Sequence, residues 1–230
     1  MRVLRASAVA IAVALLASAV PGAEAQDADR KVAGGGIAVK GWQGKVDTAS
    51  AAKQGLTIND SKFAQEGNDL RVTTGAAASY WNPANAASGD YTLKATFKEA
   101  KQTYTHPHPF GIFIGGSKLD TDQQNLLYCV AYRDGTYLVR GFFGGTATTI
   151  AKKAPNEAVA KAASPDAPVT QEIAWTVKGS RAECSVNGTV VAGFDKSEIV
   201  GPGKLDSTDG VYGLRVAHNT DVVVSGLKKN

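Results

Sequence analysis

The chain has 230 residues, 25 of them basic and 21 acidic, which gives a formal net charge of +4 at pH 7. This small excess is spread through the sequence, and no run of Lys and Arg is interleaved with aromatic residues. The composition therefore excludes the electrostatic footprint of a nucleic-acid-binding protein, and we expect no nucleic-acid partner.

The first 25 residues have the three parts of a secretion signal. Arg2 and Arg5 form a basic start, an apolar run follows over 8–20, and Ala23-Glu24-Ala25 supplies a small-residue cleavage pattern. The apolar run is too short for a transmembrane helix, and no later segment is longer or more apolar. We predict a cleaved signal peptide over 1–25, no transmembrane segment, and a secreted or periplasmic protein.

The remaining residues, 26–230, lie within the size range of one β-sandwich domain. They contain no repeat of 20–50 residues and no change of composition that would mark a second domain. A single domain over 26–230 is the prediction.

Upstream of residue 90, GLTIND (55–60) and DLRVTT (69–74) are short candidate strands. From Asp90 onward, apolar and polar residues alternate with a period of two, which is typical of half-buried antiparallel strands. The segments DYTLKATFKE (90–99) and QEIAWTVKG (171–179) show it best. Their inward positions are predicted to be Tyr91, Leu93, Ala95 and Phe97 in the first segment and Ile173, Trp175 and Val177 in the second.

Dipeptides that favour tight hairpin turns separate several apolar runs. Asp134-Gly135 divides the run over 126–143, Asn187-Gly188 divides 182–194, and Lys178-Gly179-Ser180 offers a third turn. Asn-Gly and Asp-Gly tolerate the positive φ angles of such turns, so each predicts a β-hairpin.

Two later segments complete the pattern. Residues 210–228 predict two strands bent at Asn219. Residues 154–169 are rich in Ala and Pro, and they predict a mobile loop with a helical turn near Glu157 to Ala162. That loop either overhangs a binding face or merely connects two strands.

About ten or more short strands with Gly-rich turns predict an all-β fold, a two-sheet antiparallel sandwich or jelly roll. From Gly41 to Leu227 the chain resembles an uncharacterised family of secreted bacterial proteins in the concanavalin A-like lectin/glucanase jelly-roll class. The resemblance implies the fold rather than one activity, because this class includes lectins, hydrolases and adhesion modules. It is carried by Ser88-Gly89-Asp90-Tyr91, the run from His108 to Gly116, Asp134-Gly135, Val186-Asn187-Gly188-Thr189 and the run from Asp209 to Arg215.

The stretch THPHPF places His106 and His108 each before a proline. Proline holds the preceding residue extended, and i, i+2 spacing then points both imidazoles to one side. A transition-metal site needs three or four ligands, and the only other histidine, His218, is distant in sequence. We interpret the stretch as a stiff strand entrance with surface histidines; a metal chelate and a ligand-lined cleft are the alternatives.

The acidic residues argue against one enzyme class. Retaining glycosidases need two carboxylates about 5 Å apart, and jelly-roll glucanases supply them from an E-x-D-x-x-E pattern. That pattern has no match here, since Glu172, Glu183 and Glu198 stand apart. We lean toward a protein that is not an enzyme.

One loop offers hard oxygen ligands. Asp120, Asp122 and Asn125 are close in sequence and form a candidate calcium site, although solvated turns have the same composition. We expect no cofactor, and bound calcium is the alternative.

Aromatic and planar polar side chains are the groups that bind sugars, through stacked CH faces and hydrogen-bonded hydroxyls. Strand parity places Tyr128, Tyr132 and Arg140 on the central hairpin in a suitable arrangement, although core packing explains the tyrosines equally well. The candidate ligand-binding residues are Tyr128, Tyr132, Arg140, His106, His108 and His218.

Cys129 and Cys184 are the only cysteines, and both lie in strand-like apolar runs. We predict that both are buried. Export would allow a disulfide between them, and two buried thiols remain the alternative.

Taken together, these features predict a secreted, non-catalytic β-sandwich module that binds a glycan or another envelope component. One alternative is a glycoside-acting hydrolase or lyase, because the resemblance extends to 3-keto-disaccharide hydrolase-like domains. A purely structural or adhesion domain is the second alternative.

Overall fold

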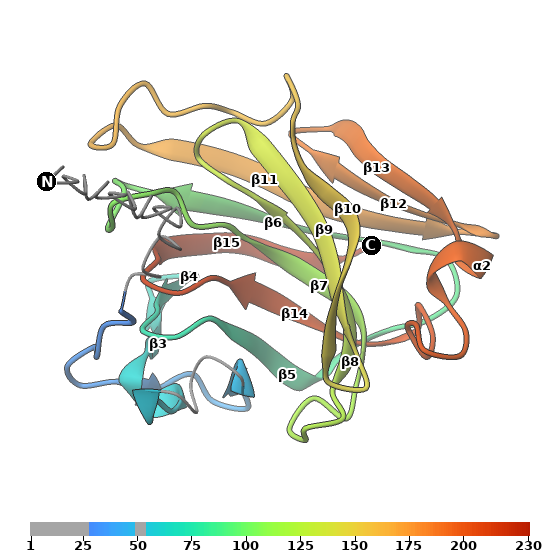
Figure 1. The fold of residues 1–230 in the computed structure, drawn as a ribbon, viewed down its shortest axis with the longest axis horizontal. Helices are drawn as coiled ribbons and strands as arrows, with labels where there is room; N and C mark the ends of the chain where they lie inside the picture. The colour runs from blue at the N-terminus through green and yellow to red at the C-terminus, as the bar shows by residue number, and fades with distance from the viewer. Residues whose placement is uncertain (1–27, 49–53) are drawn as a thin grey trace, which may run out of the picture.

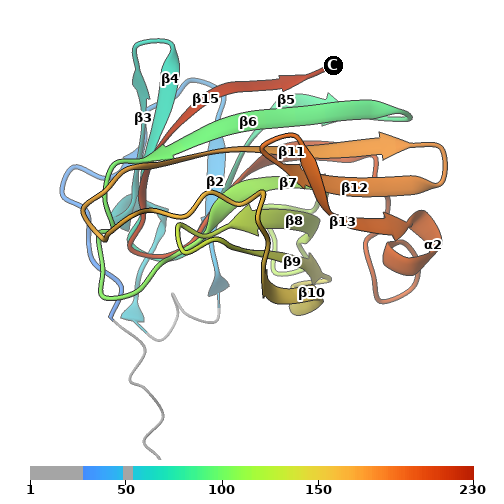
Figure 2. The same ribbon diagram turned by 90° about the horizontal axis from the view of Figure 1, so that it is seen from above.

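The computed structural model describes residues 28–48 and 54–230, so the predicted signal peptide and cleavage site lie outside the described residues. The chain forms two stacked β-sheets, with β6, β11 and β15 in one layer and β7, β8 and β9 in the other (Figures 1 and 2). Across the described ranges, no helix is long and apolar enough to cross a membrane.

Among the described residues, one sheet has eight strands in the order β1-β3-β4-β15-β6-β11-β12-β13, and the other has seven in the order β10-β9-β8-β7-β14-β5-β2. Strand pairs are antiparallel except β1 with β3, which is parallel. The predicted all-β two-sheet jelly roll is therefore confirmed. The elements are β1 (Gly36–Ile37), β2 (Gln43–Val46), η1 (Ile58–Asp60), β3 (Lys62–Glu66), β4 (Asp69–Thr73), β5 (Ala78–Ala87), β6 (Tyr91–Glu99), β7 (Phe110–Ser117), β8 (Asn125–Ala131), β9 (Thr136–Phe143), β10 (Thr146–Pro155), β11 (Val169–Lys178), β12 (Arg181–Val186), β13 (Thr189–Asp195), α2 (Lys196–Ile199), β14 (Gly210–Val216) and β15 (Asp221–Lys229).

The main core lies between the sheets and is filled by the inward positions of both layers. All seven predicted inward residues of β6 and β11 are buried, because alternate side chains of each strand point into this layer. The indole Nε1 of Trp175 donates a hydrogen bond to the Ile112 carbonyl at 3.3 Å, and so satisfies its polar atom within the apolar core.

A disulfide joins Cys129 of β8 to Cys184 of β12, with an S–S distance of 1.99 Å. Both cysteines are fully buried. Since β8 and β12 belong to different sheets, the bond crosslinks the two layers through the core.

The hairpin turns occur where the dipeptides predict them. Asn187 and Gly188 have φ angles of 49° and 84°, the two positive values that a type I′ turn requires, and Gly135 has a φ of 88°. Asn219, with a φ of 53°, lies in the bend between β14 and β15.

The predicted strand over 55–60 is wrong. Residues 58–60 form a short 3₁₀ turn, η1. The Thr57 hydroxyl accepts a hydrogen bond from the Asn59 amide, and the Asp60 carboxylate accepts one from the Thr57 amide at 2.7 Å. This capping box satisfies the orphan amides of a helical turn and overrides the strand-like pattern.

The helical turn predicted near 157–162 is also wrong. Strand β10 continues to Pro155, and the residues after it form non-helical turns. Gln171 explains the conformation, because its side-chain amide donates to the Ala160 carbonyl at 2.7 Å and accepts from the Ala160 amide at 3.0 Å. These bonds replace those of a helix, and burial of Val159 holds the segment against the sandwich.

Candidate functional site

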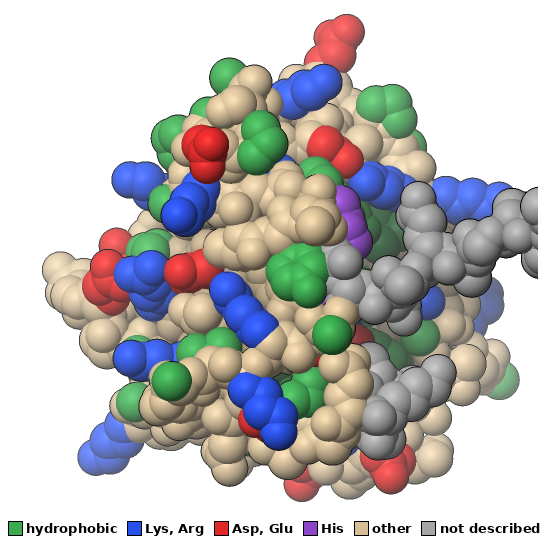
Figure 3. Space-filling model, turned by 60° about the vertical axis from the view of Figure 1, so that its left-hand side comes forward, with side chains coloured by type: hydrophobic (Ala, Val, Ile, Leu, Met, Phe, Trp, Pro, Cys, Tyr) green, Lys and Arg blue, Asp and Glu red, His purple; other side chains and the backbone are tan. Residues whose placement is uncertain are grey.

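A pocket of about 460 Å³ lies on the face of the seven-stranded sheet that points away from the main core. Its floor comes from alternate residues of β8 and β9, and its walls come from the segment before β7, the segment after β14 and the chain near Asp29 and Asp47. Figure 3 shows histidine beside a hollow bordered by hydrophobic side chains. No residue of 154–169 lines this pocket.

Strand register brings together histidines that are far apart in sequence. Val216 of β14 pairs with Phe110 of β7, and the Ala217 amide continues the ladder to the Pro109 carbonyl at 2.9 Å. One step further, His218 faces His108. Six strands and α2 lie between β7 and β14 in the chain, so a linear reading of the sequence does not reveal this pairing.

The three histidines form one cluster, in which one ligating atom from each side chain lies within 4.8 Å of the others. His106 and His108 face each other through their Nε2 atoms at 3.0 Å. The His108 and His218 rings stack with centroids 4.0 Å apart. His106 is exposed, His108 is buried, and His218 is between the two. The predicted orientation of His106 and His108 to one side is therefore present.

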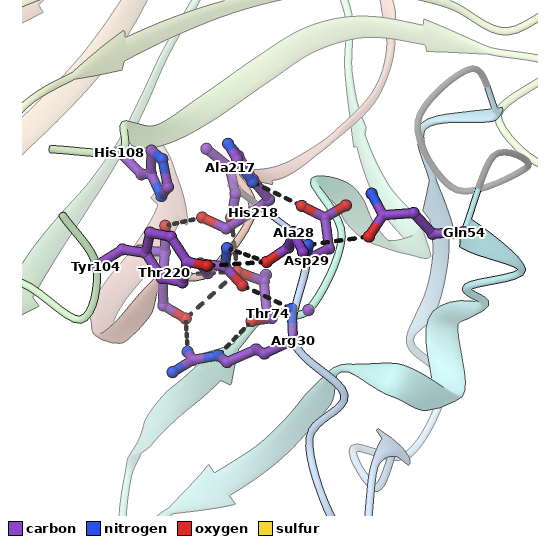
Figure 4. A network of polar contacts seen from close by, with 12 residues as sticks. Ala28, Asp29, Arg30, Gln54, Thr74, Tyr104, His108, Ala217, His218 and Thr220 are labelled. Atoms are coloured by element: carbon purple, nitrogen blue, oxygen red, sulfur yellow. Dashed lines mark hydrogen bonds and ion pairs between the residues drawn. The ribbon is translucent and has the colours of Figure 1, made fainter. Parts of the chain in front are cut away.

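Asp29 holds His218 from behind the cluster. One carboxylate oxygen, Oδ1, lies 2.6 Å from His218 Nδ1 (Figure 4). The Asp29 side chain is only 4% exposed, and its other oxygen, Oδ2, is buried without a hydrogen-bond partner among the described residues. The pair leaves His218 Nε2 for contacts on the opposite edge of the ring.

The residues around Asp29 are fixed by a polar network (Figure 4). The Arg30 guanidinium donates to the carbonyls of Thr74 and Thr220, each at 2.9 Å. The Arg30 amide donates to the Asn219 side chain at 2.9 Å. This segment, which has no regular secondary structure, is thereby attached to the bend that carries His218.

Tyr128, Tyr132 and Arg140 line the same pocket as the three histidines. Tyr128 of β8 pairs with Arg140 of β9, so their side chains are neighbours on the outer face. Burial raises the pKa of both phenols, that of Tyr132 to about 12, so both are neutral near pH 7 and can donate or accept hydrogen bonds. The Lys153 ammonium lies 4.1 Å from the centre of the Tyr132 ring.

Arg140 lines the pocket and carries a donor without a partner among the described residues. Its Nε atom is buried, and no described residue accepts a hydrogen bond from it. Buried donors in folded proteins almost always have partners, so an open one in a pocket calls for a ligand or water. The six predicted ligand-binding residues thus share one pocket, while their role in binding stays a prediction.

Arg215, by contrast, is a closed group, by which we mean that its charge is paired within the protein. Its guanidinium forms a bidentate pair with Asp47, at 2.7 and 2.5 Å, and lies 5.1 Å from the Tyr128 ring centre. Burial opposes the charge of Arg215, but the Asp47 carboxylate outweighs it and raises the pKa of the guanidinium. This pair supports the pocket floor.

Two of the three predicted calcium ligands, Asp122 and Asn125, have other partners. Asp122 contacts the Lys45 ammonium at 3.3 Å. The Asn125 amide donates to the Lys204 carbonyl at 3.1 Å and accepts from the Asp206 amide at 2.9 Å. Asp120 is exposed. Among the described residues, the histidine cluster is the only group of three or more His, Cys, Asp or Glu side chains placed to share one metal ion.

Asp29, Asp47 and Arg215 also line the pocket, and none of the three was predicted as a site residue. The sequence does indicate a buried ion pair at Arg215, because a lone charge in the apolar strand GVYGLRV must find a partner. No sequence pattern indicates a role for Asp29 or Asp47, since both lie outside strands with a clear periodicity.

The sequence matches no known protein-family model and no curated protein sequence. Two solved structures resemble the fold. A carbohydrate-binding module, CBM66 from Bacillus subtilis, has a TM-score of 0.55 at 12% identity, covering 85% of this chain and 98% of that one. A Bacillus subtilis protein of unknown function with a galectin-like fold has a TM-score of 0.56 at 14% identity, covering 84% and 90%. The chain thus has the two-sheet β-sandwich fold of these two structures.

Proposed function

We propose that the outer-face pocket binds a glycan, or another envelope component, without turnover. The observation that carries this proposal is the open Nε donor of Arg140, buried in a pocket beside Tyr128 and Tyr132. Sugars meet such sites through hydroxyls that pair with planar polar groups and through CH faces that stack on aromatic rings.

The carboxylates that line the pocket support binding rather than glycosidase chemistry. Asp29 is engaged with His218, and Asp47 with Arg215. A retaining or inverting glycosidase needs one carboxyl group to donate a proton and another to act as nucleophile or base. Both candidates here are held by cationic or imidazole partners, which suits a structural role for them.

A second candidate function is a glycoside-acting hydrolase or lyase, and one observation favours it. An imidazole oriented by a buried carboxylate, as in the His218–Asp29 pair, is a common arrangement for proton transfer. It lies in the same pocket as the aromatic wall.

Titration calorimetry with a panel of oligosaccharides, ordinary and 3-keto, tests the proposal. We expect Kd values of roughly micromolar to millimolar, because desolvating a hydrated ligand offsets much of the contact energy. Arg140→Gln should weaken binding about tenfold or more. Arg181→Gln, on β12 of the other sheet, is the matched control and should leave the affinity unchanged.

The same incubations are analysed for products. Sustained product formation that disappears in His218→Ala, with the fold intact, would establish the catalytic candidate in place of binding. No binding across the panel would leave a structural or adhesion role.

We also propose that the protein acts outside the cytoplasm. The crosslink between Cys129 and Cys184 supports this location, because disulfides persist in oxidising compartments. Cell fractionation followed by N-terminal sequencing should find a chain that begins at Gln26; a full-length cytoplasmic chain would contradict the proposal.

A further inference from the structure

The histidine cluster has the composition of a metal site. The chain contains only three histidines, and all three meet at one end of the pocket. Three convergent imidazoles are a ligand set for zinc and neighbouring first-row divalent ions, which prefer nitrogen donors. Chance placement of surface histidines does not explain the meeting, because it depends on the register between β7 and β14.

The distances allow one ion to be shared. Two nitrogens bound to one tetrahedral zinc at about 2.1 Å lie about 3.4 Å apart. His106 and His108 already approach this, with Nε2 atoms 3.0 Å apart, and all separations in the cluster are within 4.8 Å. A separation at that limit must close by about 1.4 Å, which small side-chain rotations can supply.

Asp29 supplies the second, independent observation. Metal-binding histidines usually place the nitrogen away from the metal against a carboxylate, which fixes the tautomer and orients the ring. His218 Nδ1 lies 2.6 Å from Asp29 Oδ1, so His218 Nε2 is the atom left to bind metal. The Asp29 side chain is 96% buried, and its polar network with Arg30 and Asn219 holds it in place.

We propose that His106, His108 and His218 bind one first-row divalent ion of the zinc class, with Asp29 as the residue that positions His218. Three protein ligands leave a coordination position, and the pocket lined by the same residues is where an oxygen of a bound ligand would occupy it. The metal site stands on its own geometry and does not depend on glycan binding.

The first test measures metal directly, on the full chain made without a histidine tag. After exposure to Zn²⁺ and dialysis, we expect one zinc per chain by elemental analysis. His106→Ala and His218→Ala should each lower the Zn²⁺ affinity at least about 100-fold in titration calorimetry. His106 is exposed, so its removal leaves the fold intact and keeps the test decisive if His218→Ala unfolds.

The role of Asp29 is tested by Asp29→Asn, with Glu183→Gln on β12 as the matched control. We expect about 10-fold to 100-fold weaker Zn²⁺ binding for Asp29→Asn and no change for Glu183→Gln. Substituting Co²⁺ gives a spectroscopic measure, since a site with three imidazoles and an open position absorbs visibly and shifts when an oxygen ligand binds. Circular dichroism confirms folding of each variant.

Two outcomes would overturn the proposal: no retained zinc in the wild-type chain, or zinc binding that survives loss of His106 and His218 together. Glycan binding measured in the presence of a chelator separates this proposal from the previous one. Glycan affinity in a chain that retains no zinc after exposure to Zn²⁺ would overturn the metal proposal and leave the glycan proposal standing.

Discussion

The two faces of the seven-stranded sheet show different uses of the same strands. In β8, Leu127 and Cys129 point into the main core, whereas Leu126 and Tyr128 point to the outer face and belong to a second apolar cluster. Both faces of β8 are buried. The inner face is closed by apolar packing and a disulfide, while the outer face carries arginines, tyrosines and histidines at one end.

Two arginines on the outer face, Arg215 and Arg140, also differ in whether they have a partner within the protein. Arg215 of β14 is paired with Asp47, whereas Arg140 of β9, separated from β14 by two strands of the sheet, has a buried donor without a partner among the described residues. An internal partner marks a polar group that serves the structure, and the lack of one marks a group available to a ligand. The four predictions that follow test this contrast between closed and open groups.

Removing the disulfide from the inner face should have the largest effect. The double variant Cys129→Ala with Cys184→Ala should lose about 4 kcal/mol of unfolding free energy, since the bond closes a loop of 55 residues. Chemical denaturation measures the loss. Ligand affinity should be unchanged wherever the variant is folded. Two titratable thiols in the unfolded wild-type protein would contradict the crosslink.

Replacing Arg215, the closed arginine, should lower the free energy of unfolding slightly less than removing the disulfide. Arg215→Met removes the buried cation that pairs with the Asp47 carboxylate, whose side chain is 20% exposed, and should destabilise the protein by about 3 kcal/mol. Arg71→Met removes the exposed partner of Asp221 and should cost about 1 kcal/mol or less. Equal losses for the two variants in denaturation would mean that Arg215 is not a closed, buried group.

Replacing Tyr132, which lines the pocket, should weaken ligand binding and leave the stability of the protein nearly unchanged. Tyr132→Ala should weaken glycan affinity about tenfold, because a stacked sugar face loses its ring. Tyr137→Ala, which lies in β9 and packs on the main core, should instead lower stability without changing affinity. Calorimetry measures the affinity of both variants, and thermal unfolding measures their stability. Lost affinity in Tyr137→Ala with unchanged affinity in Tyr132→Ala would contradict the assignment of ligand binding to the outer face.

The smallest expected effect is on pH dependence, away from the pocket. Partial burial pushes the pKa of Asp221 upward, but hydrogen bonds and charge from Arg71 outweigh it and hold the pKa below its usual value. The stabilisation is therefore present above the unfolded-state pKa of about 3.9 and is lost as the pH falls through the lower folded value.

Asp221→Asn should thus lower stability by about 1 kcal/mol at pH 7, and the difference from wild type should shrink as the pH falls below the unfolded-state pKa of about 3.9. Denaturation at a series of pH values measures this. A difference that persists undiminished in acid would show that Asp221 contributes through packing rather than charge.

The fold was predictable because a period of two and the Asn-Gly and Asp-Gly turns are local signals. The same parity brought Tyr128 and Arg140 together across one hairpin. The rest of the site depends on pairings between distant strands, and no local pattern specifies that His218 lies opposite His108. The position of Asp29 could not be predicted either, because it depends on hydrogen bonds from Arg30 to carbonyls far along the chain.

The contact between Asp29 and His218 also has a consequence for the order of folding. It joins residues separated by 189 positions, close to the full length of the described chain. Hairpins such as β8–β9 close over a few residues and form early, whereas a contact of this separation bears a large loop-closure entropy and forms late. In refolding, the fluorescence change of the buried Trp175 should precede the recovery of metal and ligand binding. The site is complete only when both ends of the chain are in place.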